Sequence, residues 1–234
     1  MSALLAEAPD FAPGAGVSRS AIVVMATLKG GSGKSTAAAC LASHCQRAGL
    51  RVAVIDADPQ ASLVHWQSLG EPSVDLAIVA DTSEGVARRA RSLAEDADLV
   101  VIDTAGFRNR TMIEALSVAD LAVIPIKASP LDIAAAVETV RLIEEVNATD
   151  ERRARPMDYR LLLTQVTVGS AVARHVRSEL AQAGYALFKT ELVNRVVYAE
   201  ASLVGRMPIH LDAQSAAARD GDAFAHEVQH ALGW

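Results

Sequence analysis

The chain has 234 residues and a mass of 24.6 kDa, which suits one large domain or at most two small ones. Hydrophobic residues make up 51% and charged residues 21%, which excludes global disorder, and 45 alanines against nine aromatic residues favour helices packed on a sheet over a β-sandwich or barrel. The net charge of −6 argues against a globally basic nucleic-acid binder. Residues 152–206 nevertheless carry nine basic and four acidic side chains, which permits a local basic face.

Residues 1–18 are rich in Ala, Pro and Gly and predict a flexible tail, followed by one domain over residues 19–234. The tail has no cationic start before an apolar run, so neither a signal peptide nor a transit peptide is predicted. No run approaches the ~18–20 apolar residues of a membrane span. The only cysteines, Cys40 and Cys45, match neither a disulfide framework nor a metal motif. A soluble cytoplasmic protein is expected.

Short apolar runs alternate with helical stretches along the chain. Several runs are apolar at consecutive positions, which is typical of strands buried on both faces of a parallel sheet. The predicted strands are 21–26, 52–55, 76–79, 99–102, 121–126, 159–163 and, more weakly, 186–190. The predicted helices are 34–48, 84–95, 110–117, 131–146, 171–183 and 213–232, with a polar loop at 147–156. This alternation predicts an α/β fold, a doubly wound, mainly parallel sheet flanked by helices, whose ligand lies at the carboxyl ends of the strands.

The first predicted strand runs directly into a glycine-rich turn and then an alanine-rich helix, the context that a phosphate-binding loop requires. Its backbone N–H groups and the helix N-terminus are suited to phosphate oxygens. Lys34 is expected to reach the β- and γ-phosphates, and the Ser35 hydroxyl to bind Mg²⁺. The strict pattern has a glycine where this chain has Leu28, and a lysine, Lys29, follows. The expected nucleotide-binding residues of the turn are Gly30, Gly31, Ser32, Gly33, Lys34, Ser35 and Thr36.

The sequence K-G-G-S-G-K-S-T resembles the deviant Walker A motif of the ParA/MinD group of ATPases, and the likeness extends over residues 20–232. The resemblance implies a P-loop ATPase in which Lys29 crosses to the nucleotide of the second subunit of an ATP-sandwich dimer. A cation supplied in this way would neutralise charge in the transition state, as an arginine finger does. The segment 58–66, with D-P-Q before a tryptophan, looks like the small ParF-like partition ATPases.

Two later loops carry the expected carboxylates. Asp58 resembles the family residue that positions the attacking water, and neighbouring Asp56 is expected to orient the Mg²⁺ shell. The run 99–102 ends in Asp103, a Walker B pattern expected to hold Mg²⁺ through a water. Gly106 is expected to bring a backbone N–H to the γ-phosphate. No guanine-reading N-K-x-D or T-K-x-D sequence occurs, so ATP is expected rather than GTP. The expected catalytic residues are Lys29, Lys34 and Asp58.

The basic C-terminal third also resembles ParF-like proteins. Arg195 and Tyr198 form an R-x-x-Y sequence that lies near the adenine pocket and the dimer edge in that group, so Arg195 is expected to contact the nucleotide. The resemblance further implies non-specific DNA binding by the ATP dimer, with ordinary surface charge as the alternative. Phosphate contacts alone would make this binding salt-sensitive and independent of sequence. The expected DNA contacts are Arg174, Arg177, Lys189, Arg195 and Arg206.

The resemblance as a whole implies an ATPase on the nucleoid, with ATP and Mg²⁺ as cofactors. It would dimerise on ATP and position a plasmid, chromosome or protein complex, with hydrolysis stimulated by a ParB-like or adaptor protein. One alternative is a membrane-surface ATPase similar to MinD, which needs a basic amphipathic C-terminal helix, whereas the segment here is mainly acidic, so no membrane partner is expected. The other is a metal-cluster or metal-insertion NTPase of the same fold, which needs paired cysteines at a dimer surface.

Overall fold

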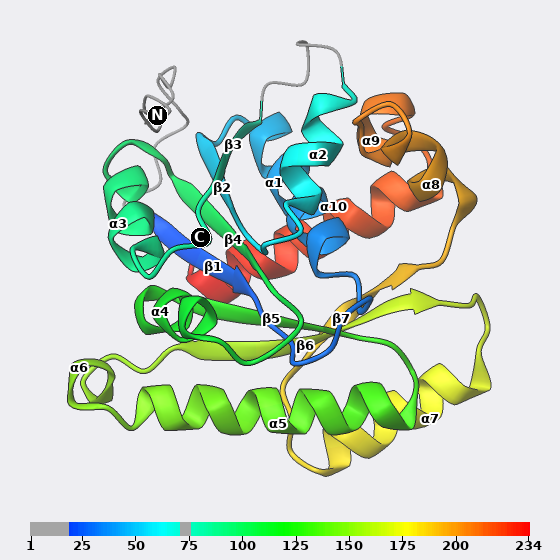
Figure 1. The fold of residues 1–234 in the computed structure, drawn as a ribbon. Coiled ribbons are helices and arrows are strands. Elements are labelled where there is room, and N and C mark those ends of the chain that lie inside the picture. Colours follow the sequence, from blue (N-terminus) through cyan, green and yellow to red (C-terminus); the bar gives the residue numbers. More distant parts are fainter. Residues whose placement is uncertain (1–18, 71–75) are drawn as a thin grey trace.

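The computed structural model describes residues 19–70 and 76–234, and the predicted tail at 1–18 lies outside the described residues. Within them, seven strands form one sheet in the order β3-β2-β4-β1-β5-β6-β7, and every pair of neighbours is parallel (Figure 1). The strands are β1 (Ala21–Met25), β2 (Val52–Ala57), β3 (Ala77–Ala80), β4 (Leu99–Thr104), β5 (Leu121–Ile126), β6 (Asp158–Val166) and β7 (Leu187–Val193). The predicted parallel, doubly wound sheet is confirmed, with β1 in its centre.

Ten helices of the described residues cover the sheet. They are α1 (Lys34–Arg47), α2 (Ser62–Ser68), α3 (Val86–Asp96), α4 (Arg110–Val118), α5 (Pro130–Asn147), α6 (Asp150–Arg153), α7 (Ala171–Gln182), α8 (Val196–Ser202), α9 (Pro208–Leu211) and α10 (Ala216–Leu232). Helices α1, α2 and α8 to α10 lie on one face of the sheet, and α3 to α7 lie on the other (Figure 1). All six predicted helices are confirmed to within a few residues at their ends.

Burial of both faces explains the uninterrupted apolar runs. In β1, Val23 and Met25 pack into a core that includes α1 and α10, whereas Ile22 and Val24 pack into a second core that includes α3, α4 and α5. Successive side chains of a strand point to opposite faces, so each strand supplies both cores. On the first face α10 docks on β7, where the rings of Phe188 and Phe224 meet edge to face with centroids 5.3 Å apart.

Four short helices are not among the six predicted ones: α2, which follows the D-P-Q segment that resembles ParF-like proteins, and α6, α8 and α9, for which the sequence gives no signal. Helix α6 lies inside the predicted polar loop 147–156, and none of α6, α8 and α9 is long enough to show a helical repeat of apolar residues. The last helix begins at Ala216 rather than 213, because the Ser215 side chain accepts a hydrogen bond from the backbone N–H of Ala218 at 3.1 Å and caps it there.

Two findings bear on the alternative functions. Cys40 and Cys45 are free and buried within α1, so neither lies at a surface where a metal cluster would be shared. Phe224 and Val228 of α10 are fully buried, so the apolar face of this helix is already used inside the protein. Across the described ranges, no helix combines the length and apolar character needed to cross a bilayer.

Candidate nucleotide-binding site

A cleft of about 540 Å³ opens at the carboxyl ends of the central strands. It is lined by the glycine-rich turn after β1, by Asp58 and Gln60 after β2, by Gly106 and Phe107 after β4, and by Gln165 at the end of β6. A second hollow of about 510 Å³ shares Gly33, Thr36 and Gln165 with the cleft and is lined on its other side by residues 192–196 and by Tyr198 and Ala199. The structure therefore brings residues far apart in the chain, including the expected Arg195, to one continuous site.

The start of α1 leaves its backbone N–H groups available. Gly33 precedes the helix in a left-handed conformation, with φ 94° and ψ 18°, and no side chain caps the helix. By contrast, Asn109 and Ser129 cap α4 and α5 by accepting hydrogen bonds from backbone N–H groups. A helix N-terminus without a side-chain cap keeps unpaired N–H donors and a partial positive charge, which together bind phosphate.

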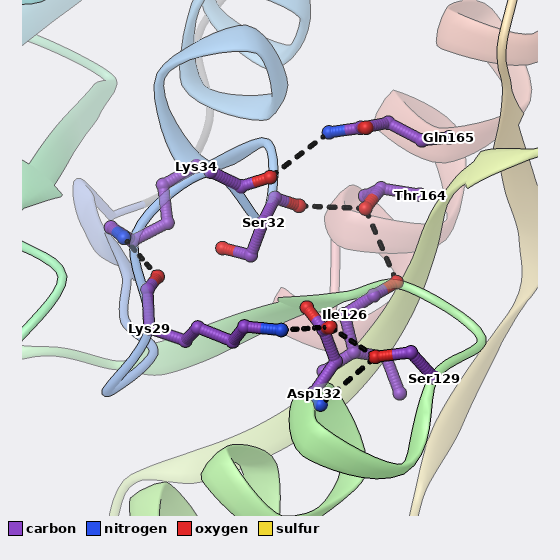
Figure 2. A network of polar contacts seen from close by, with 9 residues as sticks. Lys29, Ser32, Lys34, Ile126, Ser129, Asp132, Thr164 and Gln165 are labelled. Carbon is purple, nitrogen blue, oxygen red and sulfur yellow. Dashed lines mark hydrogen bonds and ion pairs between the residues drawn. The ribbon is translucent and has the colours of Figure 1, made fainter.

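The two lysines of the turn point in different directions (Figure 2). Lys34 is 6% exposed, and its ammonium donates to the carbonyl oxygen of Lys29 at 3.1 Å. Burial lowers the pKa of Lys34, although the negative charges of Asp103 and Asp58 act in the opposite direction. The side chain of Lys29 instead extends to Asp132 on α5 and forms an ion pair with it.

Asp132 was not expected at the site. It lies in the first turn of α5, is 2% exposed, and accepts hydrogen bonds from the Lys29 ammonium and the Ser129 hydroxyl. Burial alone would raise the pKa of Asp132, but these hydrogen bonds hold it below its ordinary value. The sequence signal, a serine followed three residues later by an aspartate, indicates only a helix start. Lys29, the ion-pair partner of Asp132, lies 103 residues earlier in the chain.

The carboxylates of β2 and β4 lie side by side because Asp56 and Asp103 are partners in the sheet register. Both are fully buried, and neither oxygen of Asp103 has a hydrogen-bond partner within the described residues. Burial raises the pKa of Asp103 to about 7, while the Ser35 hydroxyl and the Lys34 ammonium act in the opposite direction. An unpartnered buried carboxylate beside a hydroxyl is an oxygen donor set that fits Mg²⁺.

Asp56 has a different environment from Asp103. Its Oδ2 accepts hydrogen bonds from the backbone N–H groups of Leu63 at 2.8 Å and Val64 at 3.1 Å, in the first turn of α2. Burial raises the pKa of Asp56, although these N–H groups act against the rise. Asp56 therefore anchors α2, and its expected part in the Mg²⁺ shell stays a prediction. Asp58 is half-buried, lines the cleft and accepts a hydrogen bond from the Gln60 N–H at 2.9 Å.

Two residues of β6, Thr164 and Gln165, form hydrogen bonds with the backbone of the glycine-rich turn, and neither was predicted at the site from the sequence. The Thr164 hydroxyl donates to the carbonyl oxygen of Ser32 at 2.6 Å, and the Gln165 amide donates to that of Gly31 at 3.1 Å (Figure 2). Their only signal is two polar residues directly after the predicted strand 159–163. Gly106 touches the turn through its backbone, since a Cβ there would lie 2.7 Å from the nitrogen of Gly30. Only glycine permits this approach.

The sequence profile of the family described as "CobQ/CobB/MinD/ParA nucleotide binding domain" matches residues 23–209. The chain belongs to this family. Protein ParA of Rhizobium radiobacter is 28% identical over 217 residues, which cover 88% of this chain and 95% of that protein. Maintenance of carboxysome distribution protein A of Halothiobacillus neapolitanus is 28% identical over 202 residues, covering 85% and 91%. The ParA/MinD resemblance is thus confirmed, and the ParF-like subtype stays a prediction.

Among solved structures, the septum site-determining protein MinD of Pyrococcus horikoshii OT3, complexed with Mg-ADP, superposes with a TM-score of 0.69 over 92% of this chain and 98% of its own. At 15% identity, this likeness shows that the two proteins share a fold. The seven-stranded parallel sheet is therefore the fold of the ParA/MinD family.

The basic residues expected to contact DNA in this family member do not gather on one face. Arg174 and Arg177 belong to α7, whereas Arg195 and Arg206 flank α8 on the opposite side of the sheet (Figure 1). The Arg177 guanidinium pairs with Glu191 at 2.9 Å, and that of Arg195 pairs with Asp220 at 3.0 Å. Arg174 and Lys189 are exposed. The five residues therefore differ in their availability to a phosphate backbone.

Proposed function

We propose that this protein is a ParA-type ATPase that binds Mg-ATP, dimerises around two nucleotides and positions a cargo. The observation that carries the proposal is the divergence of the two lysines on one turn. Lys34 is buried and lines its own cleft, whereas the Lys29 ammonium pairs with Asp132 on α5 and its side chain is 33% exposed. A second cation on the same turn that does not line its own cleft supports a role at a second subunit's nucleotide.

Each group of the cleft has a chemical task in this proposal. The N–H groups of the turn and the Lys34 ammonium bind the phosphates, and Ser35 and Asp103 hold Mg²⁺. Mg²⁺, when bound, neutralises negative charge on the β- and γ-phosphates. Asp58 faces the cleft from the loop after β2 and orients the attacking water. The second hollow, with Arg195 and Tyr198 on its wall, has the size and place for the adenine base.

The dimer makes hydrolysis depend on association. In the single chain Lys29 is held by Asp132, and in the dimer it leaves that carboxylate for the partner's γ-phosphate, where its charge stabilises the transition state. Hydrolysis is then slow in the monomer and is accelerated when a partner protein, ParB-like or an adaptor, binds the dimer. This dependence supplies the timing that a positioning cycle requires.

DNA binding completes the proposed cycle and places the protein on the nucleoid. Arg174, Arg177, Lys189, Arg195 and Arg206 bind phosphates without reading bases, and Arg177 and Arg195 leave the carboxylates with which they pair. Such binding weakens steeply with salt. The names of the relatives, ParA and the carboxysome distribution protein, support a plasmid, chromosome or protein complex as the cargo.

The test is light scattering and ATP turnover of the wild-type protein and three variants. We expect the wild type to dimerise with Mg-ATP, Asp58→Ala to form a persistent ATP dimer, and Lys34→Ala to lose nucleotide binding. Lys29→Ala is the matched comparison on the same turn, and it should bind ATP but lose dimer-dependent turnover. Unchanged ATP affinity in Lys34→Ala, or full turnover in Lys29→Ala, would refute the proposal.

A further inference from the structure

Helix α2 is fixed at its N-terminal end to a buried carboxylate beside the proposed cation site. The Asp56 Oδ2 accepts the N–H groups of Leu63 and Val64, at 2.8 and 3.1 Å, and Asp56 is the register partner of Asp103. The residue before the helix, Ala61, offers no side-chain cap. The first turn of α2 therefore depends on a carboxylate of β2 for its hydrogen bonds.

The segment that leads into α2 passes through the nucleotide cleft and is strained at one position. Asp58, Pro59, Gln60 and Ser62 line the cleft. Ala61 between them adopts a left-handed conformation, with φ 49° and ψ 43°, which is unfavourable for a residue with a Cβ. A strained residue held by its surroundings marks a place where the backbone can change conformation when a ligand alters those surroundings.

The other end of α2 is locked to residues 205–206. The indole N–H of Trp66 donates to the carbonyl oxygen of Arg206 at 3.3 Å. The backbones of Gly70 and Gly205 touch directly, since a Cβ on Gly205 would lie 2.2 Å from the nitrogen of Gly70. No side chain separates these two backbones, so a displacement of the end of α2 is passed on to residues 205–206.

The structure also leaves α2 room to move. A hollow of about 290 Å³ that is partly open to the surface lies between α1, α2 and α8, lined by Ser35, Leu63, Trp66 and Tyr198 among others. In Figure 1, α2 lies between α1 and the α8–α9 corner of the molecule. Close-packed helices resist displacement, whereas a helix beside a hollow of this size can shift as a unit.

We propose that α2 is a mechanical link through which nucleotide occupancy of the cleft sets the position of residues 205–206. A cation and γ-phosphate acting on the loop 56–60 move the short helix, and Trp66 and Gly70 carry that movement to Arg206. This inference rests on the proposed function, because Arg206 is one of the residues expected to contact DNA. It makes affinity for DNA respond to the nucleotide without direct contact between them.

The first test uses Trp66 as its own reporter. Trp66 and Trp234 are the two tryptophans of the chain, so Trp234→Phe leaves the emission of Trp66 alone. We expect Mg-ATPγS to shift this emission and change its quenching by acrylamide, saturating at the concentrations at which a fluorescent ATP analogue binds. Nucleotide binding with unchanged Trp66 emission and quenching would overturn the link alone. Failure of any nucleotide to bind would overturn both the link and the proposed function.

The second test separates coupling from stability. Trp66→Phe keeps an aromatic ring but removes the donor to Arg206, and Trp234→Phe is the matched control. By fluorescence anisotropy with a random-sequence duplex, the ratio of DNA affinities in Mg-ATPγS and Mg-ADP should fall about fivefold in Trp66→Phe, the effect of losing one hydrogen bond. The ratio should hold in Trp234→Phe. An unchanged ratio in Trp66→Phe would overturn the link. If that variant does not fold, the fluorescence measurement of Trp66 in the Trp234→Phe protein decides whether the link exists.

Discussion

Replacement of Asp103 by asparagine tests the electrostatics of the cleft without any nucleotide. The carboxyl group titrates near 3.8 in the unfolded chain, and burial raises its pKa to about 7 in the folded protein. This difference of about 3 corresponds to about 4 kcal/mol at about 1.36 kcal/mol per pKa unit. The Asn variant has nothing to titrate at this position, so the comparison isolates a single buried charge.

The direction in which the free energy of unfolding changes with pH depends on whether the folded or the unfolded protein holds the proton on Asp103. Between pH 4 and pH 7 the folded protein keeps a proton on Asp103 that the unfolded chain has released, so the free energy of unfolding falls as the pH rises through this window. From pH 5 to pH 8 the loss amounts to about 2–3 kcal/mol. His44 and His210, whose pKa values burial lowers, also make stability depend on pH, but they do so equally in both proteins.

The assay is urea unfolding followed by circular dichroism at pH 5 and pH 8, with EDTA present to remove cations. We expect wild type to lose about 2–3 kcal/mol more than Asp103→Asn between the two pH values. Asp98→Asn is the control, because hydrogen bonds from Arg51 lower the pKa of that buried carboxyl and it is ionised at both pH values. It should destabilise equally at pH 5 and pH 8. Equal pH dependence in wild type and Asp103→Asn would refute the reasoning.

Two further substitutions test the backbone and side-chain supports of the turn. In Gly106→Ala the new Cβ would lie within 3.0 Å of three backbone atoms of residues 29–30, so the two loops must separate, and ATP turnover should fall by up to about 100-fold. Gly85→Ala, whose Cβ would meet only the Ser83 hydroxyl, should leave turnover unchanged. Thr164→Val keeps the side-chain shape but removes the donor to Ser32, so nucleotide affinity by calorimetry should fall about fivefold, and an unchanged affinity would show that the turn needs no support from β6.

The sequence determines the fold well because burial of a parallel sheet leaves a plain pattern. Val100 and Val101 of β4 are both apolar because one packs into each core, and the same reasoning holds for β1, β2 and β5, in which every residue is buried. The turn at residues 29–36 is local in sequence, so its motif alone predicts its place. Short helices such as α8 are too brief to show a repeat and depend on tertiary contacts that the sequence does not reveal.

The contacts that complete the site join residues far apart in the chain. Neither Asp132 as partner of Lys29 nor Thr164 beneath Ser32 can be predicted from spacing, because sheet order decides which loops meet. The sequence placed Asp56 and Asp58 together, but only the register sets Asp56 beside Asp103, and only the structure shows Asp56 bound to α2. The scatter of the basic residues over both faces follows from the same long-range geometry.

The position of Thr164 and Gln165 beneath the glycine-rich turn has a consequence for biosynthesis. All residues of the turn have been synthesised once residue 36 is added. Strand β1, however, has no neighbouring strand until β4 and β5 have been synthesised, and the turn forms its hydrogen bonds with β6 only after that strand follows. Contacts this distant form late on the ribosome. A nascent chain released before residue 165 would carry the whole phosphate-binding motif and yet lack the support that shapes it for ATP.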